Sequence, residues 1–379
     1  MKIGMASAYF ATMKGGGEHY TLHLSNKLAD LGYDITIICG RQPFKQPEPL
    51  SDRFKIEYVS QLYFLRDWGM REIQLISRGA RFVHSRHYMF SCYRHLLKNH
   101  NHNFDIIHTH DPASLRAAIR IKKKYDIPIV STFHGHPSPR HIEEVKNVDA
   151  ILPVSKEIKI SFDKCGIENV YDIPGGVDLS FLKPLNKEKC KEALELNGKV
   201  ILFVGRLIPT KNLFNLLHAF KKVQSMIADT KLLIVGDGAL KGDLIRATQR
   251  LRLNENVIFT GLISFEKLLV YYNAANVFVL PSIFESFSLV SLEAAACGVP
   301  IVISTGADAF ITDFGEDALF VTQPDDPVKI AESLITALTD DEEIGEKVSL
   351  SLKRVKSYDW MERAKKVAVI YKGCLSGEA

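Results

Sequence analysis

Two glutamates near residue 290 carry the strongest sign of chemistry in this chain of 379 residues, and seven residues separate Glu285 from Glu293. The apolar run Val277–Leu280 predicts a strand before them, and the pattern after it predicts a helix that starts near Ser286. Glu285 would then precede a helix N-terminus, beside unpaired backbone N–H groups of Phe287, Ser288, Leu289 and Val290. Such a carboxylate can accept hydrogen bonds from sugar hydroxyls, while the amides and the helix dipole favour phosphate. The spacing alone would also suit a capped surface helix with two solvated glutamates.

Two cations follow the first predicted strand of the second half of the chain. Arg206 follows the strand Val200–Val204 after a single residue, Gly205, and Lys211 lies at the start of the next helix, which Thr210 or Asn212 could cap. Two cations beside a helix N-terminus can neutralise a leaving diphosphate without a metal ion. A pair of solvated basic residues is the alternative.

Three glycines follow the first strand of the chain, Lys2–Ala6. Gly15, Gly16 and Gly17 precede a helix that we expect to run to about Leu31. Glycines let backbone approach a ligand closely, and the helix end favours an anion. The segment is neither a P-loop nor a dinucleotide-binding fingerprint, because G-K-[ST] and G-x-G-x-x-G are both absent. A flexible turn is the alternative.

Histidines gather at two neighbouring predicted strand ends. His108, His110 and Asp111 follow one strand, and His134 and His136 follow the next, so they could line one edge of a sheet. We expect no metal here, because no carboxylate or cysteine has ligand spacing. For any single histidine, a structural hydrogen bond is the alternative.

Taken together, the motifs resemble those of the retaining GT-B glycosyltransferases of group 1, which are related to glycogen and sucrose synthases and to bacterial mannosyltransferases. The two glutamates, followed by small residues that end at Gly298-Val299-Pro300, carry the resemblance, and it extends over nearly the whole chain. It implies that Glu285 contacts the donor sugar and Glu293 the nucleotide ribose.

The same resemblance implies roles for the other motifs. Arg206 and Lys211 would bind the diphosphate, and His134 would lie near the donor sugar. The segment with Gly16 and Gly17 would close over the reacting centre. The residues near the base would be Gly261, Leu262 and Ile263.

Two positions differ from the family's common pattern. Ser288 and Asn212 stand where relatives often have glycine. The difference at Ser288 leaves the local turn open, because glycine permits backbone conformations that serine disfavours.

Short apolar runs alternate with helical periodicities along the chain, which is typical of parallel β/α units. In the first half the predicted strands are Lys2–Ala6, Ile35–Cys39, Ile56–Val59, Asp105–His108, Ile129–Thr132, Ala150–Val154 and Val170–Ile173. In the second half they are Val200–Val204, Lys231–Val235, Val257–Thr260, Val277–Leu280, Pro300–Ile303 and Ala318–Val321.

A break near residue 180 separates the two series. We therefore expect an α/β fold of the GT-B type, with two Rossmann-like doubly wound domains that face each other across a cleft. Residues 1–176 would form the acceptor side and residues 177–357 the donor-binding side. A C-terminal helix over residues 358–375 would pack back on the first domain.

Charge and cysteine usage limit the classes of partner and compartment. Residues 1–173 hold 24 Lys and Arg against 18 Asp and Glu, an excess too mild for a nucleic-acid-binding protein. The six cysteines are scattered, which indicates a reducing compartment. The start of the chain does not follow a signal-peptide pattern, and no apolar run approaches the ~20 residues of a membrane span. We expect a cytoplasmic protein.

Residues 61–102 form a basic segment. It holds seven Lys and Arg against two acidic residues, and apolar pairs recur every seven residues, so an amphipathic helix is predicted. The basic face could be solvated, or it could meet anionic lipid at the inner face of the membrane or a phosphorylated acceptor.

These features lead to a functional hypothesis. The chain would transfer a hexose, with retention, from a UDP-, GDP- or ADP-sugar to a lipid-linked or carbohydrate acceptor, without a cofactor or metal. The catalytic residues would be His134, Glu285, Arg206 and Lys211, and no residue stands out as a covalent nucleophile. The alternatives are a nucleotide-sugar epimerase of the same fold and a non-catalytic protein that binds sugar nucleotides.

Overall fold

A computed structural model describes residues 1–8, 10, 15–41, 51–60, 74–98 and 104–377, and only the backbone of residues 74–85. The chain divides into two compact units, which are described separately below. The first is Met1–Pro174 with Trp360–Ala379, and the second is Gly175–Asp359. The boundary expected from the sequence lies two residues later, after residue 176.

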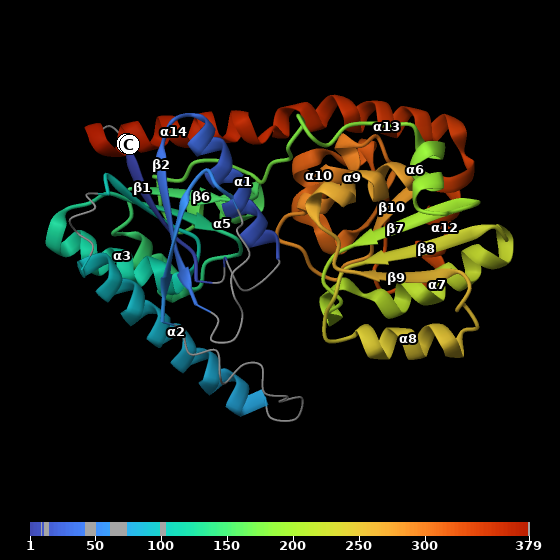
Figure 1. The fold of residues 1–379 in the computed structure, drawn as a ribbon, viewed down its shortest axis with the longest axis horizontal. Coiled ribbons are helices and arrows are strands. Elements are labelled where there is room, and N and C mark those ends of the chain that lie inside the picture. Colours follow the sequence, from blue (N-terminus) through green and yellow to red (C-terminus); the bar gives the residue numbers. More distant parts are fainter. Residues whose placement is uncertain (9, 11–14, 42–50, 61–73, 99–103, 378–379) are drawn as a thin grey trace. The chain divides into compact units, whose positions relative to one another are not determined.

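A six-stranded parallel sheet forms the centre of the first unit, with the order β3-β2-β1-β4-β5-β6. The strands are β1 (Lys2–Ala6), β2 (Asp34–Gly40), β3 (Lys55–Val59), β4 (Ile106–Thr109), β5 (Ile129–Phe133) and β6 (Ala150–Pro153). The helices are α1 (Gly16–Asp30), α2 (Gln74–Lys98), α3 (Pro112–Tyr125), α4 (Pro139–Val145), α5 (Lys156–Asp163) and α14 (Trp360–Ser376). Figure 1 shows α1 and α14 on one face of this sheet and α2 and α3 on the other.

Six of the predicted strands of this half are confirmed to within one residue at each end, and the seventh, Val170–Ile173, is wrong. Val170 makes only an isolated bridge to Ile151. The Ile173 carbonyl accepts a hydrogen bond from the Tyr20 hydroxyl instead of from a strand (3.3 Å), and the following Pro174 has no N–H for a ladder. Val170 and Ile173 are therefore buried by packing and not by sheet pairing.

The amphipathic helix predicted in the basic segment is confirmed as α2. Residues 61–73 and 99–102 of that segment, with Arg66 and Arg71, lie outside the described residues.

The second unit repeats the plan of the first, with a parallel sheet of order β12-β11-β10-β7-β8-β9. Its strands are β7 (Lys199–Val204), β8 (Thr230–Val235), β9 (Val257–Gly261), β10 (Val277–Leu280), β11 (Ile301–Ser304) and β12 (Phe320–Thr322). Its α-helices are α6 (Lys187–Ala193), α7 (Leu213–Met226), α8 (Lys241–Arg250), α9 (Phe265–Ala274), α10 (Leu289–Ala296), α11 (Asp308–Phe314), α12 (Pro327–Thr339) and α13 (Asp341–Val355). Four short 3₁₀ helices are η2 (Pro209–Lys211), η3 (Thr305–Ala307), η4 (Glu316–Ala318) and η5 (Lys356–Tyr358). All six strands predicted for this half are confirmed, with ends within two residues.

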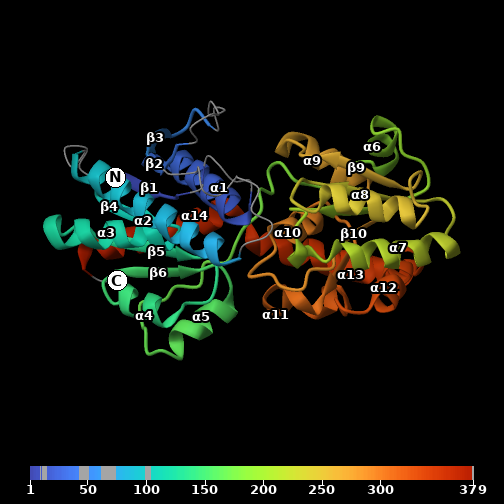
Figure 2. The same ribbon diagram turned by 90° about the horizontal axis from the view of Figure 1, so that it is seen from below.

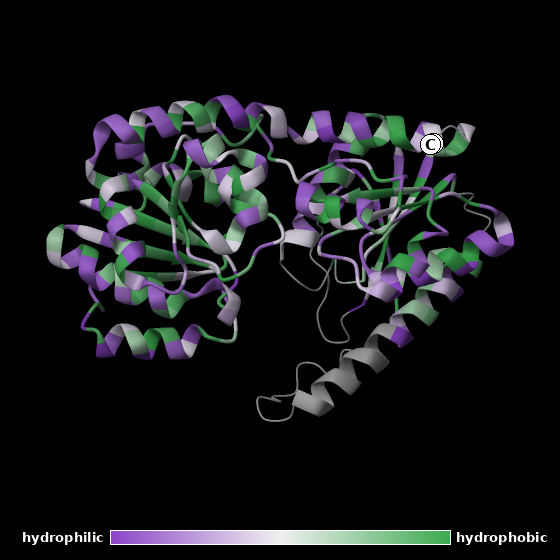
Figure 3. Ribbon diagram, turned by 180° about the vertical axis from the view of Figure 1, so that it is seen from behind, coloured by the Kyte–Doolittle hydropathy of each residue, from purple (hydrophilic) through white to green (hydrophobic). Residues whose placement is uncertain are grey.

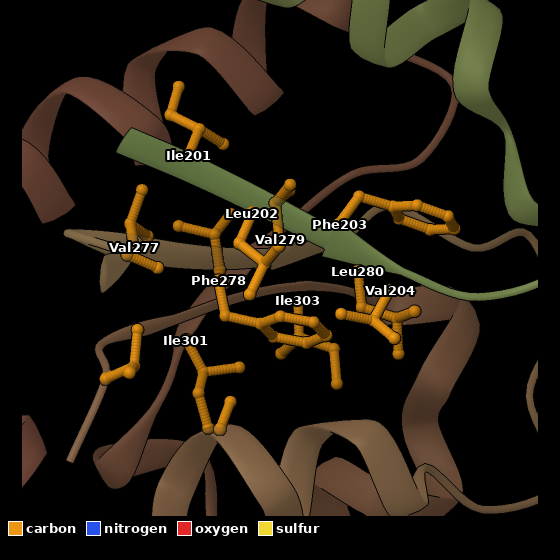
Figure 4. Close-up of a cluster of buried hydrophobic side chains, with 14 of the residues drawn as sticks. Ile201, Leu202, Phe203, Val204, Val277, Phe278, Val279, Leu280, Ile301 and Ile303 are labelled. Carbon is orange, nitrogen blue, oxygen red and sulfur yellow. The ribbon is translucent and has the colours of Figure 1, made fainter. Parts of the chain in front are cut away.

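Helices cover both faces of the second sheet, with α7 and α8 on one face and α9 and α10 on the other (Figures 1 and 2). Strands buried on both faces need continuous apolar runs, and the central strands β7 and β10 have them. Phe203 and Phe278 are fully buried between these layers (Figure 4), and the strands inside this unit are mostly hydrophobic in Figure 3.

Both sheets reverse their strand order between the first and fourth strand of the unit. These reversals lie between β1 and β4 and between β7 and β10, and they are the positions where doubly wound sheets bind ligands, at the carboxyl ends of the strands. The predicted α/β fold with two Rossmann-like domains is confirmed. In the described part of the chain, no helix is long and apolar enough to cross a membrane.

Candidate active site

Lys211 and Glu285 form an ion pair at the carboxyl ends of β7 and β10. Lys211 is the last residue of η2, and Glu285 lies in the loop after β10. Glu285 Oε1 also accepts a hydrogen bond from Ser282 Oγ (2.8 Å). The side chains are only 14% and 13% exposed, so water screens the pair weakly. Two of the predicted catalytic residues therefore meet at the switch point of the second sheet.

The loop that carries Glu285 is held from both neighbouring strand ends. The Ile283 N–H donates to the Thr210 carbonyl (2.8 Å), and the Glu285 N–H donates to the Gly306 carbonyl (2.9 Å). A Cβ at Gly306 would lie 2.1 Å from the Ser282 carbonyl oxygen. A glycine is therefore required for this approach of two backbone segments.

Arg206 sits on a rigid backbone with an exposed side chain. The adjacent Leu207 N–H donates to the Asp237 carbonyl (3.0 Å), and Gly236, with φ of +137°, packs directly on the Gly205 carbonyl. Within the described residues the guanidinium makes no hydrogen bond or ion pair, so the structure does not join Arg206 to Lys211 or Glu285. The guanidinium is available to an anionic ligand.

Asn212 has the left-handed conformation, with φ of +56°. Asparagine is among the few non-glycine residues that adopt this region readily, which explains why it can replace the glycine of relatives. It precedes α7 but its side chain does not cap that helix; Nδ2 donates to the Pro281 carbonyl (3.0 Å). Asn212 thus ties the Lys211 segment to the end of β10.

The helix α10 begins at Leu289, three residues later than predicted. Ser288 is the N-cap, because its Oγ accepts a hydrogen bond from the Ser291 N–H (3.2 Å). Its φ of −114° is ordinary for serine, so the turn does not need the glycine found in relatives. Glu285 consequently lies in the loop and not immediately before the helix.

The amides at this helix end remain available. Across the described residues, no hydrogen bond uses the backbone N–H groups of Phe287, Ser288, Leu289 and Val290. The Phe287 ring packs against Phe310 with centroids 5.6 Å apart, which fixes the loop. Unpaired amides at a helix N-terminus form an anion-binding site.

Glu293 lies inside α10 and is 8% exposed. Its Oε2 accepts a hydrogen bond from the hydroxyl of Tyr272 on α9 (2.7 Å). Burial raises the pKa of Glu293 to about 7, and the Tyr272 hydrogen bond acts in the opposite direction. Tyr272 could not be identified from sequence motifs, because nothing in its spacing distinguishes it from an ordinary helix residue.

The segment predicted to lie near the base begins at the last residue of β9. Gly261 ends that strand with φ of +75°, and its carbonyl accepts from the Gly236 N–H (2.8 Å). Leu262 is 58% exposed, and Ile263 packs partly on the core. The segment thus lies at the carboxyl end of the same sheet, two strands from β7.

In the first unit, three members of the predicted histidine group form a stack, and one of them, His134, is the predicted catalytic histidine. The rings of His108 and His110 are 4.4 Å apart, and those of His110 and His134 are 5.9 Å apart. A Cβ at Gly17 would lie 3.7 Å from the His134 ring, so the first turn of α1 covers this histidine. Gly16 and Gly17 are therefore in the helix and not in a preceding loop, and Gly16 is exposed.

The three histidines differ in their hydrogen bonds. His108 is fully buried, and its ring nitrogens contact the Tyr371 hydroxyl (2.6 Å) and Thr132 Oγ1 (2.8 Å), so its role is structural. Both ring nitrogens of His110 and Nε2 of His134 are buried without a partner in the described residues. Burial lowers the pKa of His134 to about 4 and that of His110 well below its usual value, so both are neutral near pH 7.

Two other residues of the predicted histidine group have structural roles. Asp111 caps α3 by accepting from the Ala113 N–H (2.9 Å). His136 is exposed and contacts Ser161 (2.9 Å) and Glu157 (3.2 Å). No group of three His, Cys, Asp or Glu side chains within the described ranges could hold a metal ion.

Comparison with protein families gives one match for each half of the chain. Residues 14–181 match "Glycosyltransferase Family 4", and residues 186–349 match "Glycosyl transferases group 1".

Characterised and uncharacterised relatives agree with these matches. The chain is 26% identical to the uncharacterized glycosyltransferase YqgM of Bacillus subtilis over 57% of its own length and 62% of that protein. It is 25% identical to glycogen synthase of Mycobacterium tuberculosis, over 100% of the chain and 96% of that protein. It is 26% identical to phosphatidyl-myo-inositol mannosyltransferase of Mycolicibacterium smegmatis, over 98% and 93%.

Solved structures share the fold over the whole chain. Sucrose-phosphate synthase from Thermosynechococcus elongatus has a TM-score of 0.80 at 20% identity and covers 100% of both chains. Anabaena HepE in complex with UDP-glucose has a TM-score of 0.77 at 18% identity, over 98% of this chain and 100% of that one. With both halves matched by family and the fold shared throughout, the chain belongs to the group 1 glycosyltransferases of the GT-B type.

Proposed function

We propose that the protein transfers a hexose from a nucleoside-diphosphate sugar to a lipid-linked or carbohydrate acceptor, with retention of the anomeric configuration. One observation carries this proposal: the Lys211–Glu285 ion pair lies at the same switch point as the unpaired amides of α10. A cation and amides suit a diphosphate, and a carboxylate suits sugar hydroxyls.

The second unit would bind the donor. Lys211, Arg206 and the amides of residues 287–290 would stabilise the diphosphate as it leaves. In enzymes, charge stabilisation of this kind is usually the largest single contribution to catalysis. These groups supply positive charge without a metal ion, so the reaction would need none. The UDP-glucose complex of the similarly folded HepE supports a nucleotide sugar, and UDP-, GDP- and ADP-sugars are the candidates.

Glu285 and His134 would hold the transferred sugar. A neutral His134 can donate one hydrogen bond and accept another, which suits a sugar hydroxyl. Transfer would occur on the face that the diphosphate leaves, because no residue is assigned as a covalent nucleophile. The mannosyltransferase relative supports a lipid-linked acceptor, and glycogen synthase supports a carbohydrate acceptor.

A nucleotide-sugar panel tests the proposal. The donor should raise the melting temperature, since ligands of the native state stabilise it by mass action. With an acceptor present, the product should keep the anomeric configuration of the donor, as read from NMR couplings, and EDTA should leave the rate unchanged. A product with the inverted anomeric configuration would refute retention. Loss of activity with EDTA, restored by Mg²⁺ or Mn²⁺, would refute independence of a metal ion. Conversion of the donor sugar to its epimer without acceptor would indicate an epimerase.

A further inference from the structure

Glu293 is a buried carboxylate with an unusual partner. The residue is 8% exposed, yet within the described residues no Lys, Arg or His pairs with it. A buried carboxylate normally needs a cation or several hydrogen bonds to offset its lost hydration. Here the hydroxyl of the fully buried Tyr272 is the one side-chain donor, at 2.7 Å from Oε2. Such an arrangement costs stability relative to an apolar pair, which indicates that the carboxylate serves a purpose other than packing.

The Tyr272 ring is fixed, so its hydroxyl holds Oε2 in one place. The ring packs against Phe278 of β10 with centroids 6.0 Å apart, and both residues are fully buried. Burial and the neighbouring Glu293 carboxylate raise the pKa of Tyr272 well above its usual value, so the phenol stays protonated and donates. The hydrogen bond links α9 to α10 across 21 residues of sequence.

The second carboxylate oxygen is left available. Oε1 of Glu293 has no hydrogen-bond partner in the described part of the chain. If Tyr272 occupies Oε2, a ligand hydroxyl can be accepted only at Oε1 without displacing the tyrosine. The family resemblance of the Glu285–Glu293 motif assigns that hydroxyl to the ribose of the nucleotide.

We propose that Tyr272 is a positioning residue that orients Glu293 for a ribose hydroxyl and thereby sets the preference for ribonucleotides over deoxyribonucleotides. This inference rests on the proposed function, because it takes the donor to be a nucleotide sugar; the family resemblance supplies the contact between Glu293 and the ribose. Tyr272 acts through Glu293 and does not itself touch the nucleotide.

Tyr272→Phe tests the inference, because it removes one oxygen and keeps the ring. Calorimetry with the full chain would use UDP, GDP and ADP, and then the 2′-deoxy and 3′-deoxy forms of the one that binds best. We expect the variant to bind the ribonucleotide about 10-fold more weakly, the loss that follows when one hydrogen bond to a charged group is removed. It should bind the deoxy form that lacks the contacted hydroxyl as the wild type does.

Tyr271→Phe is the matched control. Tyr271 is the neighbouring residue of α9, and within the described residues its hydroxyl makes no hydrogen bond. This variant should keep the wild-type affinities for both forms. If Tyr272→Phe folds poorly, the ratio of its affinities for the ribo and deoxy forms still tests the inference, because unfolded protein lowers the measured binding of both forms equally.

The outcomes separate this inference from the proposed function. An equal loss for ribo and deoxy forms in Tyr272→Phe would make its role purely structural and would overturn the inference. The inference is also overturned if Glu293→Gln abolishes the preference for the ribonucleotide while Tyr272→Phe retains that preference. If Glu293→Gln leaves the preference at its wild-type value, or if none of the three nucleotides binds, the donor-site assignment itself fails.

Discussion

Arg206 and Lys211 present their charges in different surroundings. The Lys211 ammonium is already paired with Glu285, whereas the Arg206 guanidinium is exposed and has no partner in the described residues. Under the proposed function, Lys211 would both neutralise Glu285 and contact the diphosphate, whereas Arg206 would contact only the ligand.

This difference leads to a prediction for alanine variants. Arg206→Ala and Lys211→Ala should each lower kcat by about 10²-fold, because each removes charge stabilisation of the leaving diphosphate. Lys211→Ala should also raise KM for the donor, since Glu285 loses the cation that holds it. Lys329→Ala, which breaks an exposed pair with Glu332, is the control. Wild-type rates in both site variants, measured with the donor found in the panel, would contradict the diphosphate assignment.

The histidine stack makes the stability of the first unit depend on pH. His110 lies between His108 and His134, all three with pKa values lowered by burial. The unfolded chain binds protons near pH 6.5 and the folded state does not, so the free energy of unfolding falls as pH drops below 6.5.

We predict that His110→Leu reduces this dependence. The substitution breaks no hydrogen bond within the described residues and removes one group that protonates only on unfolding. Relative to the wild type, the variant should gain up to about 1.4 kcal/mol for each pH unit below 6.5. Urea unfolding at pH 7.5 and 5.5, followed by fluorescence of Trp360 in the same unit, measures the difference. Parallel profiles for the two proteins would show that His110 protonates equally in the folded state.

At the scale of elements, the Glu285 loop depends on how β10 and β11 end. The short helix η3 follows β11 and places Gly306 against the Ser282–Ile283 backbone. The Ser304 hydroxyl also donates to the Ser282 carbonyl. The position of the Glu285 carboxylate is therefore set by two backbone segments in contact and not by its own loop alone.

Gly306→Ala should disturb this contact. The added Cβ would lie 2.1 Å from the Ser282 oxygen, which is a backbone atom, so the loop must move. A displacement of about 1 Å at a catalytic group can cost on the order of 10²-fold in rate. Steady-state kinetics with the donor measures this.

Gly345→Ala is the matched control for that variant. Gly345 lies inside α13, and no atom lies within 4 Å of an added Cβ. It should keep the wild-type rate and raise stability by about 0.5–1 kcal/mol, because alanine favours a helix. Equal kinetics in the two variants would show that the Gly306 contact does not position Glu285.

At the scale of the whole molecule, positive charge is concentrated in the first half and in its basic segment, residues 61–102. We propose that this segment, through α2, attracts the protein to anionic membranes, with about 1 kcal/mol from each basic residue near the surface. Replacing Arg78, Arg81 and Arg86 by glutamine should then abolish sedimentation with phosphatidylserine vesicles at low salt. High salt should do the same to the wild type.

A matched variant separates location from net charge. Lys123→Gln, Lys124→Gln and Lys146→Gln together remove three exposed charges from α3 and the end of α4. This variant should still sediment with vesicles, and both variants should hydrolyse free donor like the wild type. If the wild type ignores the vesicles, α2 has a solvated basic face and the acceptor is soluble.

The sequence by itself determined the strands, their grouping into two series and the motifs at their ends. Apolar runs and glycines are local signals, and a parallel sheet brings strand ends to one edge whatever the details of packing. For that reason Lys211 and Glu285, 74 residues apart in sequence, could be assigned to one ligand site, but their ion pair was not predicted. The strand at Val170–Ile173 was mistaken because apolar composition signals burial, which packing can satisfy as well as pairing.

Only the tertiary structure decided the contacts between side chains on different elements. The helix α10 begins at Leu289 and not near Ser286 as predicted, because the Ser288 hydroxyl accepts a hydrogen bond from the Ser291 N–H. The sequence offers several possible N-cap residues here, and it does not show which one caps the helix. The Tyr272–Glu293 bond and the contact of His108 with Tyr371, 263 residues away, leave no periodic pattern in the sequence. A buried polar group needs a hydrogen-bond partner, and the packing of the surrounding elements decides which partner is within reach. That packing depends on the whole core, so the pair cannot be predicted from a local pattern.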